Sequence, residues 1–371
     1  MVKLLEYQGK ELLSRYGITV PKSIIIKNET SIPEFKTTSF LKAQVPVGHR
    51  GERGGVVKVN NKAEVEKAIQ NISKLKFDGY TADSFLLEEE VPHDLEFYVS
   101  ISLDRSTRLP VLLISKKGGV DIEKIEDSEI YRYSINPLMG IPDYFSRLIS
   151  RQLSLPDILT ISLLQLLNSL FNIYKKEDAE LVEINPLVLN SMKNGLIALD
   201  SKVVIEDDAM FRHKEITDYT SRWLDPLELE AKQKGISFVR LGGKIGVIAN
   251  GAGLTMATLD ILKNNNADAG DFLDLGGTDD PEKITQAFEL INKTNPSALF
   301  VNIFGGVTKC DVVADGLIKA ISEFKPKFNI VVRLKGFREK EATEILKSNG
   351  INSFSDMEEA VKKVIELAGV K

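Results

Sequence analysis

Two carboxylates and a carboxamide form the most chemically informative set in the sequence. Glu183 and Asn185 are two positions apart in a predicted strand, so their side chains share one face. Asp200 ends the next predicted strand, and a hairpin between the two strands would bring it to the same pair. Hard oxygen ligands of this kind suit Mg²⁺, which usually also keeps waters and substrate phosphates. The alternative is a solvated strand face. However, Glu183 is surrounded in sequence by apolar residues, where burying a charge that has no partner costs free energy.

A glycine-rich segment follows the strand predicted at Ser39–Val45. Residues 48–55 contain four glycines, which let the backbone curl until its N–H groups face an anion. Lys42 could supply a point charge to the same phosphates, and His49 is a candidate phosphate contact or phosphoryl acceptor. The segment is therefore a candidate phosphate-binding flap, with a flexible hairpin as the alternative.

Three consecutive glutamates, residues 88–90, end the strand predicted at Phe85–Glu90. The simpler interpretation is an acidic strand end facing solvent. A hinge between two lobes would instead offer backbone groups to a purine and a carboxylate to a ribose.

Two glycine loops in the second half of the chain each precede a predicted helix. One is Asn250–Gly253 and the other is Gly305–Thr308. A helix N-terminus with free backbone N–H groups is a ready anion site, although a tight structural turn uses glycine equally well. Two such loops at one sheet edge favour a functional crevice. The sequence contains no P-loop and no complete dinucleotide-binding fingerprint.

The elements that position these loops alternate strand and helix about five times. Buried strands separated by amphipathic helices indicate a parallel sheet that is covered on both faces. Their order and lengths predict a flavodoxin-like, doubly wound α/β domain, in which the βα loops all open at the carboxyl edge. The glycine loops should therefore meet at one crevice. The predicted strands are nearly continuous apolar runs at Ile245–Ala249, Phe272–Leu275, Ala298–Phe304, Ile330–Leu334 and Ile351–Phe354.

The first half of the chain has the mixed pattern of an α+β domain. A long helix is predicted at Asp157–Tyr174, with Pro156 just ahead of it as a start signal. The chain is predicted to divide into a first domain at 1–224, a connection at 225–241 and a second domain at 242–371. Antiparallel strands are expected at Val56–Val59, Glu96–Leu103, Leu109–Ser115, Ala179–Leu189 and Leu196–Asp200.

Composition limits the classes of function that need to be considered. The 371 residues carry a net charge of −5, which argues against a nucleic-acid surface. No apolar run approaches the roughly 18 residues of a membrane-spanning helix, and the charged residues soon after Met1 do not form a secretory segment. A single cysteine, Cys310, fits a reducing compartment, so a cytoplasmic protein without membrane contact is expected.

The histidines and the cysteine are not expected to form a site of their own. The three histidines lack the spacing of metal ligands on one helix face, and His93 and His213 are predicted to lie at the surface. Cys310 lies in the first turn of a predicted helix, whose dipole would lower the thiol pKa. Because no base is evident beside it, this cysteine is interpreted as structural.

Several of these segments resemble the β subunits of succinyl-CoA synthetases, the succinate–CoA ligases that form ADP or GDP. The matches occur in the right order along nearly the whole chain, which is specific for a family in a way that one short motif is not. The resemblance implies an ATP-grasp domain followed by the flavodoxin-like ligase domain. The matching segments are Glu6–Leu12, Lys42–Val45, Gly54–Val56, Gly118–Glu123, Glu183–Leu187, Asn250–Leu254, Phe272–Gly277 and Val301–Gly306.

The resemblance also implies four groups of site residues, carried over by position. One group contacts the nucleotide, with Glu88, Val91 and Glu96 at the base and ribose. The others hold Mg²⁺, stabilise a phosphohistidine, and bind the carboxylate substrate that is phosphorylated. They are Lys42, His49, Arg50, Gly51, Glu88, Val91 and Glu96 for the nucleotide, Asn185 and Asp200 for Mg²⁺, Glu183 for the phosphohistidine, and Asn250, Gly305, Gly306 and Val307 for the substrate.

In this family a nucleoside triphosphate phosphorylates a histidine, the phosphate passes to succinate, and CoA displaces it to give the thioester. The histidine and the CoA-binding domain belong to an α subunit, which nothing in this sequence resembles. The chain is therefore expected to act only with that partner. Departures from the usual pattern at His49, Glu52, Arg53 and Thr278 leave open the choice between ATP/ADP and GTP/GDP and the identity of the acid.

Three other functions remain compatible with the residues. A ligase of the same architecture could act on malate, citrate or acetate with the same core residues. A stand-alone ATP-grasp carboxylate–amine ligase would need no partner, and this interpretation assigns no function to the second domain. A non-catalytic nucleotide-sensing module would bind and assemble without Asn185 or Asp200, but an intact set of site residues speaks against it.

Overall fold

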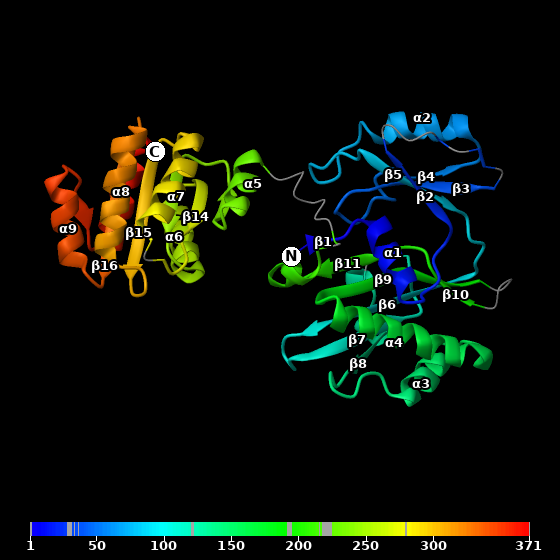
Figure 1. Cartoon of the computed structure of the whole chain (residues 1–371). Helices are drawn as coiled ribbons and strands as arrows, with labels where there is room; N and C mark the ends of the chain where they lie inside the picture. The colour runs from blue at the N-terminus through cyan, green and yellow to red at the C-terminus, as the bar shows by residue number, and fades with distance from the viewer. Residues whose placement is uncertain are drawn as a thin grey trace. The chain divides into compact units, whose positions relative to one another are not determined.

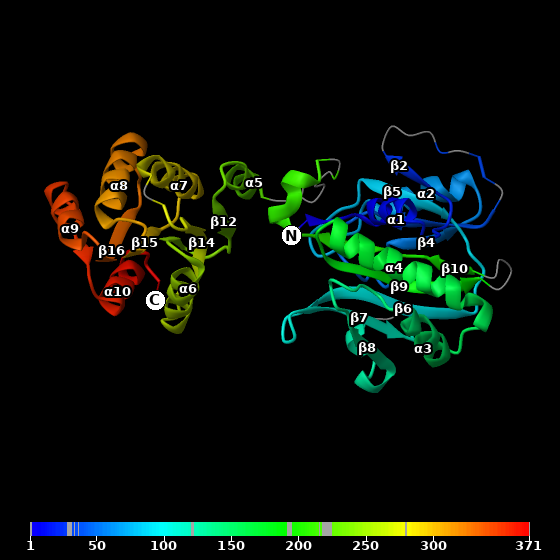
Figure 2. The ribbon, with the colours of Figure 1, turned by 60° about the horizontal axis from the view of Figure 1, so that its bottom comes forward.

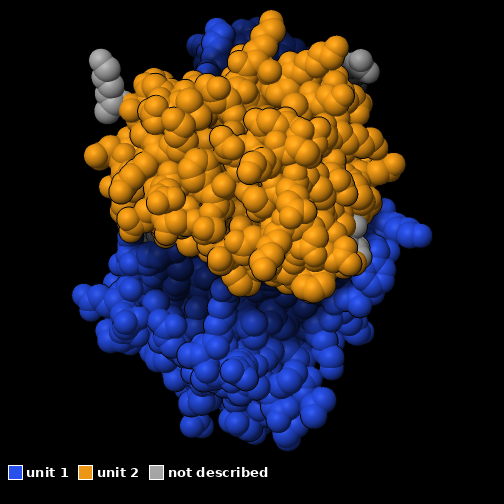
Figure 3. Space-filling view, turned by 90° about the vertical axis from the view of Figure 1, so that its left-hand side faces the viewer, with its two compact units in different colours: residues 1–223 blue, residues 224–371 orange. Residues whose placement is uncertain are grey.

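The chain folds into two compact units, Met1–Trp223 and Leu224–Lys371, which Figure 3 shows in different colours. The computed structural model describes residues 2–370 apart from 28–31, 33, 36, 120–121, 191–194, 215, 217–224 and 279. The end of the first predicted domain, at residue 224, lies outside the described residues, as do Val120 and Asp121 of the matching segment 118–123. Within the described ranges, no helix is both long and apolar enough to span a membrane.

The larger sheet of the first unit is antiparallel, with the strand order β1-β11-β9-β6-β7-β8 and with β10 paired to β9. Helices α1 (Glu6–Arg15), α3 (Asp143–Leu153) and α4 (Thr160–Lys176) share one apolar core with these strands (Figure 1). The strands are β1 (Val2–Lys3), β6 (Leu95–Asp104), β7 (Leu109–Ser115), β8 (Ile130–Ser134), β9 (Ala179–Asn190), β10 (Gly195–Ala198) and β11 (Lys202–Ile205).

A smaller antiparallel sheet in the same unit has the order β2-β5-β3-β4. Helix α2 (Lys62–Ile72) contributes Val65 and Ala68 to a separate core beside this sheet. Asn61 precedes the helix as its N-cap, because its side chain accepts the N–H of Glu64 in the first turn. The strands are β2 (Ser23–Lys27), β3 (Ser39–Ala43), β4 (Val56–Val59) and β5 (Ser84–Glu89).

The predicted α+β character of this unit is confirmed, although one detail that concerns the site differs. The predicted hairpin exists, because β10 pairs antiparallel with β9. Asp200, predicted at the end of the second strand, lies instead in the turn between β10 and β11. The sequence pattern does not predict β11, whose Lys202 is the cross-strand partner of Glu183.

The second unit is built around a six-stranded sheet with the order β12-β14-β13-β15-β16-β17. Strands β13 to β17 run parallel, and their order is the flavodoxin-like one that the sequence predicts. The strands are β12 (Ser237–Arg240), β13 (Ile245–Ala249), β14 (Ala269–Asp274), β15 (Ala298–Gly305), β16 (Asn329–Gly336) and β17 (Ser353–Phe354).

The segment predicted as a connection, 225–241, contains a short helix followed by a strand. Helix α5 (Pro226–Gln233) has Asp225 as its N-cap, whose side chain accepts the N–H of Leu227. Strand β12 follows and pairs antiparallel with β14 at the edge of the sheet. This segment therefore belongs to the second unit's sheet.

Helices cover both faces of the parallel sheet (Figure 2). One face packs around a core that includes Ile284, Leu317 and Leu346, and the other around Leu262 and Val361. Both faces of the strands are thus buried, which explains their nearly continuous apolar sequences. The helices are α7 (Pro281–Thr294), α8 (Cys310–Phe324) and α9 (Glu339–Ser348) on the first face, and α6 (Ala252–Asn264) and α10 (Met357–Leu367) on the second.

Asp271 is a buried carboxylate on β14. It is 2% exposed, and its Oδ1 has no hydrogen-bond partner among the described residues. Burial raises the pKa of Asp271 from 3.8 to about 6, although a hydrogen bond from Thr294 and the charge of Arg240 oppose the shift. The folded chain holds this proton more tightly than the unfolded chain, so the stability that protonation contributes is lost as the pH rises from about 4 to about 6.

Replacing Asp271 by asparagine is expected to raise the melting temperature at pH 8, because the buried charge is removed. A pKa shift of about two units corresponds to roughly 3 kcal/mol of unfolding free energy. The gain should shrink at pH 4.5, where the wild-type carboxyl group is already largely protonated. Thermal unfolding at both pH values checks this, with Asp260→Asn as a surface control. An equal gain at both pH values would contradict the explanation.

Candidate functional site

Lys42 lies on β3 within a set of buried charges. Its Nζ donates to Glu6 Oε1 at 3.0 Å, to Glu88 Oε1 at 2.6 Å and to the carbonyl of Leu199 at 2.8 Å. Burial alone would lower the pKa of Lys42, but the two carboxylates raise it. Lys42 is therefore fully charged, as a contact to phosphates requires.

Arg50 brings the glycine-rich segment to the same set of charges. Its guanidinium lies 2.8 Å from Glu6 Oε2 and 3.3 Å from both carboxylate oxygens of Asp200. Its other terminal nitrogen donates to the carbonyl of Ala43 on β3 at 2.8 Å. The structure thus places a predicted phosphate-binding residue beside a predicted metal ligand.

Asp200 is held close to β9 by the backbone. The N–H of its neighbour Leu199 donates to the carbonyl of Pro186 at 3.0 Å, and Pro186 directly follows Asn185. Burial and the charge of Glu6 raise the pKa of Asp200, while the nearby cations lower it. A divalent cation beside this carboxylate would add the positive charge that favours its ionised form.

Glu183 and Asn185 are alternate residues of β9 and therefore share a face. The hydroxyl of Tyr98, on β6, donates to Glu183 Oε2 at 3.0 Å. Burial raises the pKa of Glu183, although the charge of Lys202 and this hydrogen bond lower it. Asn185 Oδ1 accepts the N–H of Gly119 at 2.7 Å. Glu183 is thus held by a side chain of the neighbouring strand β6, and Asn185 is held by the backbone of the loop after β7.

The two predicted metal ligands fit a Mg²⁺ ion whose other ligands come from the nucleotide substrate and from water. Among the residues that the structure describes, no three His, Cys, Asp or Glu side chains form a cluster that could hold a metal ion by themselves. Asn185 and Asp200 offer one carboxamide and one carboxylate. Mg²⁺ is commonly bound through one or two carboxylates together with waters and substrate phosphates. A site of this composition would therefore bind the ion chiefly as its complex with a nucleotide.

The residues predicted for the base and the ribose lie in two places. Glu88, on β5, is 3% exposed, and its carboxylate contacts the ammonium groups of Lys42 and Lys10. Val91 and Glu96 are joined by His93, whose Nδ1 lies 2.6 Å from the Val91 carbonyl and whose Nε2 lies 3.0 Å from Glu96 Oε1. The side chain of Glu88 therefore faces the phosphate-binding charges rather than this second cluster.

His49 and Gly51 lie in the exposed part of the glycine-rich segment. His49 has a φ of 58°, in the left-handed region, and its imidazole lies 3.8 Å from the carboxylate of Glu52. A Cβ on Gly51 would meet no other atom. Both positions are accessible to a ligand that arrives from solvent.

The loops predicted to bind the carboxylate substrate meet at the carboxyl edge of the second sheet. The side chain of Asn250, after β13, donates to the carbonyl of Phe304 and accepts its N–H, both at 2.9 Å. These bonds tie β13 to the end of β15 where the strand order reverses, which is the usual ligand position in such sheets. Glycine is required at 305, because a Cβ there would lie 2.6 Å from the sulfur of Cys310.

Gly306 and Val307 lie in the loop between β15 and α8, beside the loop after β14. Thr308 joins the two loops, because its hydroxyl donates to the Gly276 carbonyl at 3.3 Å and accepts the Thr278 N–H at 3.1 Å. Val307 is 78% exposed. A cavity of about 670 Å³, lined by residues 335–341, opens at the end of the neighbouring strand β16. The predicted substrate residues thus share one edge of the sheet.

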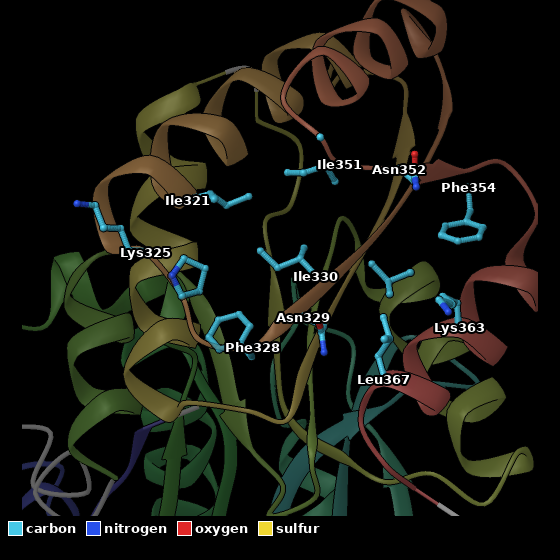
Figure 4. Close-up of a pocket in the computed structure, with 13 residues that line it drawn as sticks. Ile321, Lys325, Phe328, Asn329, Ile330, Ile351, Asn352, Phe354, Lys363 and Leu367 are labelled. Atoms are coloured by element: carbon cyan, nitrogen blue, oxygen red, sulfur yellow. The ribbon is translucent and has the colours of Figure 1, made fainter.

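A second cavity of the same unit lies at the amino end of β16 (Figure 4). It has a volume of about 490 Å³, and its lining includes Phe328, Ile330 and Ile351, together with Lys325 and Lys363. The predicted substrate loops follow the carboxyl ends of the strands. This cavity is therefore not part of the predicted site.

Two side-chain predictions are wrong. Cys310 begins α8, but burial raises the pKa of its thiol, whose sulfur lies 3.6 Å from the Lys335 carbonyl, and outweighs the expected effect of the helix dipole. The thiol is buried, which accords with the structural interpretation. His213, predicted at the surface, is 6% exposed, and its Nε2 lies 2.8 Å from Asp178 Oδ2.

Three residues that contact the predicted site were not expected there. Glu6 and Lys10 are one helical turn apart on α1, 2.8 Å from each other and both buried. Their opposite charges, four residues apart on the apolar face of a helix, are a sequence pattern from which this buried ion pair could have been predicted. Tyr98 reaches Glu183 only through the pairing of β6 with β9, for which the sequence holds no local signal.

Known proteins match the chain over nearly its whole length. The ATP-grasp domain family matches residues 3–189, and the CoA-ligase family matches residues 248–367. The β subunits of succinate–CoA ligase [ADP-forming] from Staphylothermus marinus and Aquifex aeolicus are 40% and 39% identical to the chain, over 99% of each sequence. The fold is similar to that of an ATP citrate lyase from Methanothrix soehngenii, with a TM-score of 0.79, 19% identity and coverage of 98% of this chain and 99% of that one.

The fold and these matches together define an acid–thiol ligase subunit with an ATP-grasp domain and a CoA-ligase domain. The chain belongs to the family of succinate–CoA ligase (ADP-forming) β subunits. The family, the order of the two domains and the enzyme class that the sequence predicts are thus confirmed.

Proposed function

We propose that the chain is the nucleotide-binding subunit of a succinyl-CoA synthetase, which forms succinyl-CoA reversibly from succinate, CoA and a nucleoside triphosphate. The observation that carries this proposal is that Lys42 and Arg50, both largely buried, lie in one set of charges with the partly exposed Asp200. Such a set supplies cations for phosphates and a carboxylate for a metal ion at the same place. The names of the relatives supply the acid and the thiol.

In the ATP-grasp unit, Lys42, Arg50 and the backbone of the glycine-rich segment bind the nucleotide phosphates. Asn185 and Asp200 would hold Mg²⁺, which would supply positive charge to the transferred phosphoryl group. Glu183 faces the incoming phosphohistidine and stabilises positive charge on its ring. The raised pKa of Glu183 supports this assignment, because a partly desolvated carboxylate interacts strongly with a nearby cation.

The base and the ribose bind beside Val91 and Glu96, along the segment that leaves β5. The bonds from His93 to both residues support this placement, because they hold the segment in a fixed shape. Glu88 acts at the phosphate end of the nucleotide, through its contact with Lys42.

In the CoA-ligase unit, Asn250 and the Gly305–Val307 loop bind the carboxylate of succinate. A carboxylate oxygen of succinate attacks the phosphohistidine and takes the phosphoryl group, which gives an acyl phosphate. The thiol of CoA then displaces phosphate from this acyl phosphate and forms the thioester. Backbone N–H groups at the start of α8 lie at the same edge, where they favour an anion.

A second chain supplies the histidine that carries the phosphate and the domain that binds CoA. Three large apolar side chains support such a partner, because Phe304, Val307 and Phe337 are all more than half exposed beside the substrate loops. Exposed apolar groups gathered at a functional edge are typical of a surface that another molecule covers. A cytoplasmic location stays a prediction that rests on the lone cysteine.

Co-expression with the α-type subunit of the same genome tests this proposal. Thioester formation is measured with succinate, malate, citrate and acetate, each with ATP and with GTP. We expect turnover with succinate, and a preference for ATP because the relatives are named ADP-forming. If the complex turned over malate, citrate or acetate but not succinate, that acid would replace succinate as the proposed substrate. Binding of nucleotide without turnover on any acid would favour a sensing module.

A further inference from the structure

Lys10 duplicates the contacts that Lys42 makes inside the buried set of charges. Its Nζ lies 2.8 Å from Glu6 Oε1, donates to the Leu199 carbonyl at 2.7 Å, and contacts Glu88 Oε2. Lys42 contacts the same Glu6 oxygen, the same carbonyl and the other oxygen of Glu88. Two ammonium groups therefore share one carbonyl and two carboxylates.

The two lysines differ in their access to a ligand. The side chain of Lys10, on α1, is 3% exposed, whereas that of Lys42 is 12% exposed. The charge of Lys42 also influences the pKa of Asp200 more strongly than the charge of Lys10 does. Lys42 is thus the lysine that faces the predicted metal ligands, and Lys10 is enclosed with the carboxylates.

The set is electrically balanced as it stands. A nucleoside triphosphate brings several negative charges, and its phosphates compete with Glu6 and Glu88 for Lys42. Glu6 also has Arg50 as a partner. If Lys42 were the only cation beside Glu88, its transfer to the phosphates would leave that buried carboxylate unpaired, which is strongly unfavourable. The members are the carboxylates Glu6, Glu88 and Asp200 and the cations Lys10, Lys42 and Arg50.

We infer that Lys10 is a positioning residue that frees Lys42 for the nucleotide phosphates by remaining on Glu6 and Glu88 as their permanent counter-ion. This role rests on the proposed function, because it takes a nucleoside triphosphate as the ligand of Lys42. Lys10 itself touches no phosphate and acts through Lys42. Its place one turn after Glu6 on α1 fixes it in that position whether or not nucleotide is bound.

Replacing Lys10 by methionine keeps a long apolar side chain but removes the counter-ion. Lys42 should then stay with Glu6 and Glu88, so the affinity for ATP with Mg²⁺ should fall by about tenfold or more. The affinity for adenosine, which has no phosphate, should be nearly unchanged, whereas a merely structural role would weaken both ligands alike. Calorimetric titration of the complex with the α-type subunit measures both. Lys10→Arg should retain most of the ATP affinity, and the surface variant Lys67→Met is the matched control.

Unchanged ATP affinity in Lys10→Met, or an equal loss for ATP and adenosine, would overturn the inference. If this variant does not fold, Glu88→Gln is compared with Lys10→Met/Glu88→Gln, in which Glu6 keeps Arg50 as its partner. These two should bind ATP equally, and a much weaker double variant would also overturn the inference. A wild-type complex that binds no ATP would instead refute the proposed function.

Discussion

Replacing Glu183 by glutamine is expected to slow phosphorylation of the partner's histidine by about a hundredfold or more, while the two subunits still assemble. The amide keeps the shape of the side chain and can still accept the hydrogen bond of Tyr98, which is 3.0 Å away. It lacks the negative charge with which Glu183 is proposed to stabilise the imidazole ring during phosphoryl transfer. Transfer of radiolabelled γ-phosphate from ATP to the α-type subunit measures the effect.

The pH dependence gives a second readout of the same residue. Because burial raises the pKa of Glu183, its carboxylate takes up a proton at a higher pH than an ordinary glutamate. Wild-type phosphotransfer should therefore decline as the pH falls through that raised pKa, and Glu183→Gln should not show this decline. Glu66→Gln, on the exposed side of α2, should behave as the wild type does. If Glu183→Gln transferred the phosphoryl group at the wild-type rate at pH 8, Glu183 would have no role in the transfer.

Replacing Asp200 by asparagine is expected to lower turnover by about a hundredfold or more and to raise the Mg²⁺ concentration that gives half-maximal rate. Asp200 is the one carboxylate of the predicted metal pair, and Arg50 lies 3.3 Å from both of its oxygens. The substitution therefore weakens the hold on the ion and on the glycine-rich segment together. Turnover of the complex measured against Mg²⁺ concentration checks both effects.

Asp260→Asn is the matched control for this change, because Asp260 is exposed on α6 in the other unit. It should leave turnover and Mg²⁺ dependence as they are in the wild type. If Asp200→Asn also left both unchanged, Asp200 would not be a metal ligand.

The fold of the second unit could be predicted almost completely because its signals are local. Strands β13 to β16 are buried on both faces, so each one appears as an apolar run between a glycine loop and an amphipathic helix. The parallel order then brings the loops after β13 and β15 to one edge. The contact between Asn250 and Phe304 follows from that order and from no property of either residue alone.

The site of the first unit could be predicted only in part because its contacts are long-range. Lys42 is recognisable beside a glycine-rich segment, yet its partners Glu6 and Glu88 come from a helix and a strand far away in the chain. Glu88 looks like an exposed strand end in the sequence, but it is buried and contacts Lys10 of α1. Asp200 lies in a turn, where no strand periodicity marks its direction.

The most direct test of the account is thioester formation from succinate, CoA and ATP by the chain with and without the α-type subunit of its genome. Each chain is purified separately and assayed alone, and the two are then mixed. The account predicts succinyl-CoA only from the mixture, with phosphohistidine found on the α-type subunit. Succinyl-CoA made by this chain alone, or none made by an assembled complex, would contradict it.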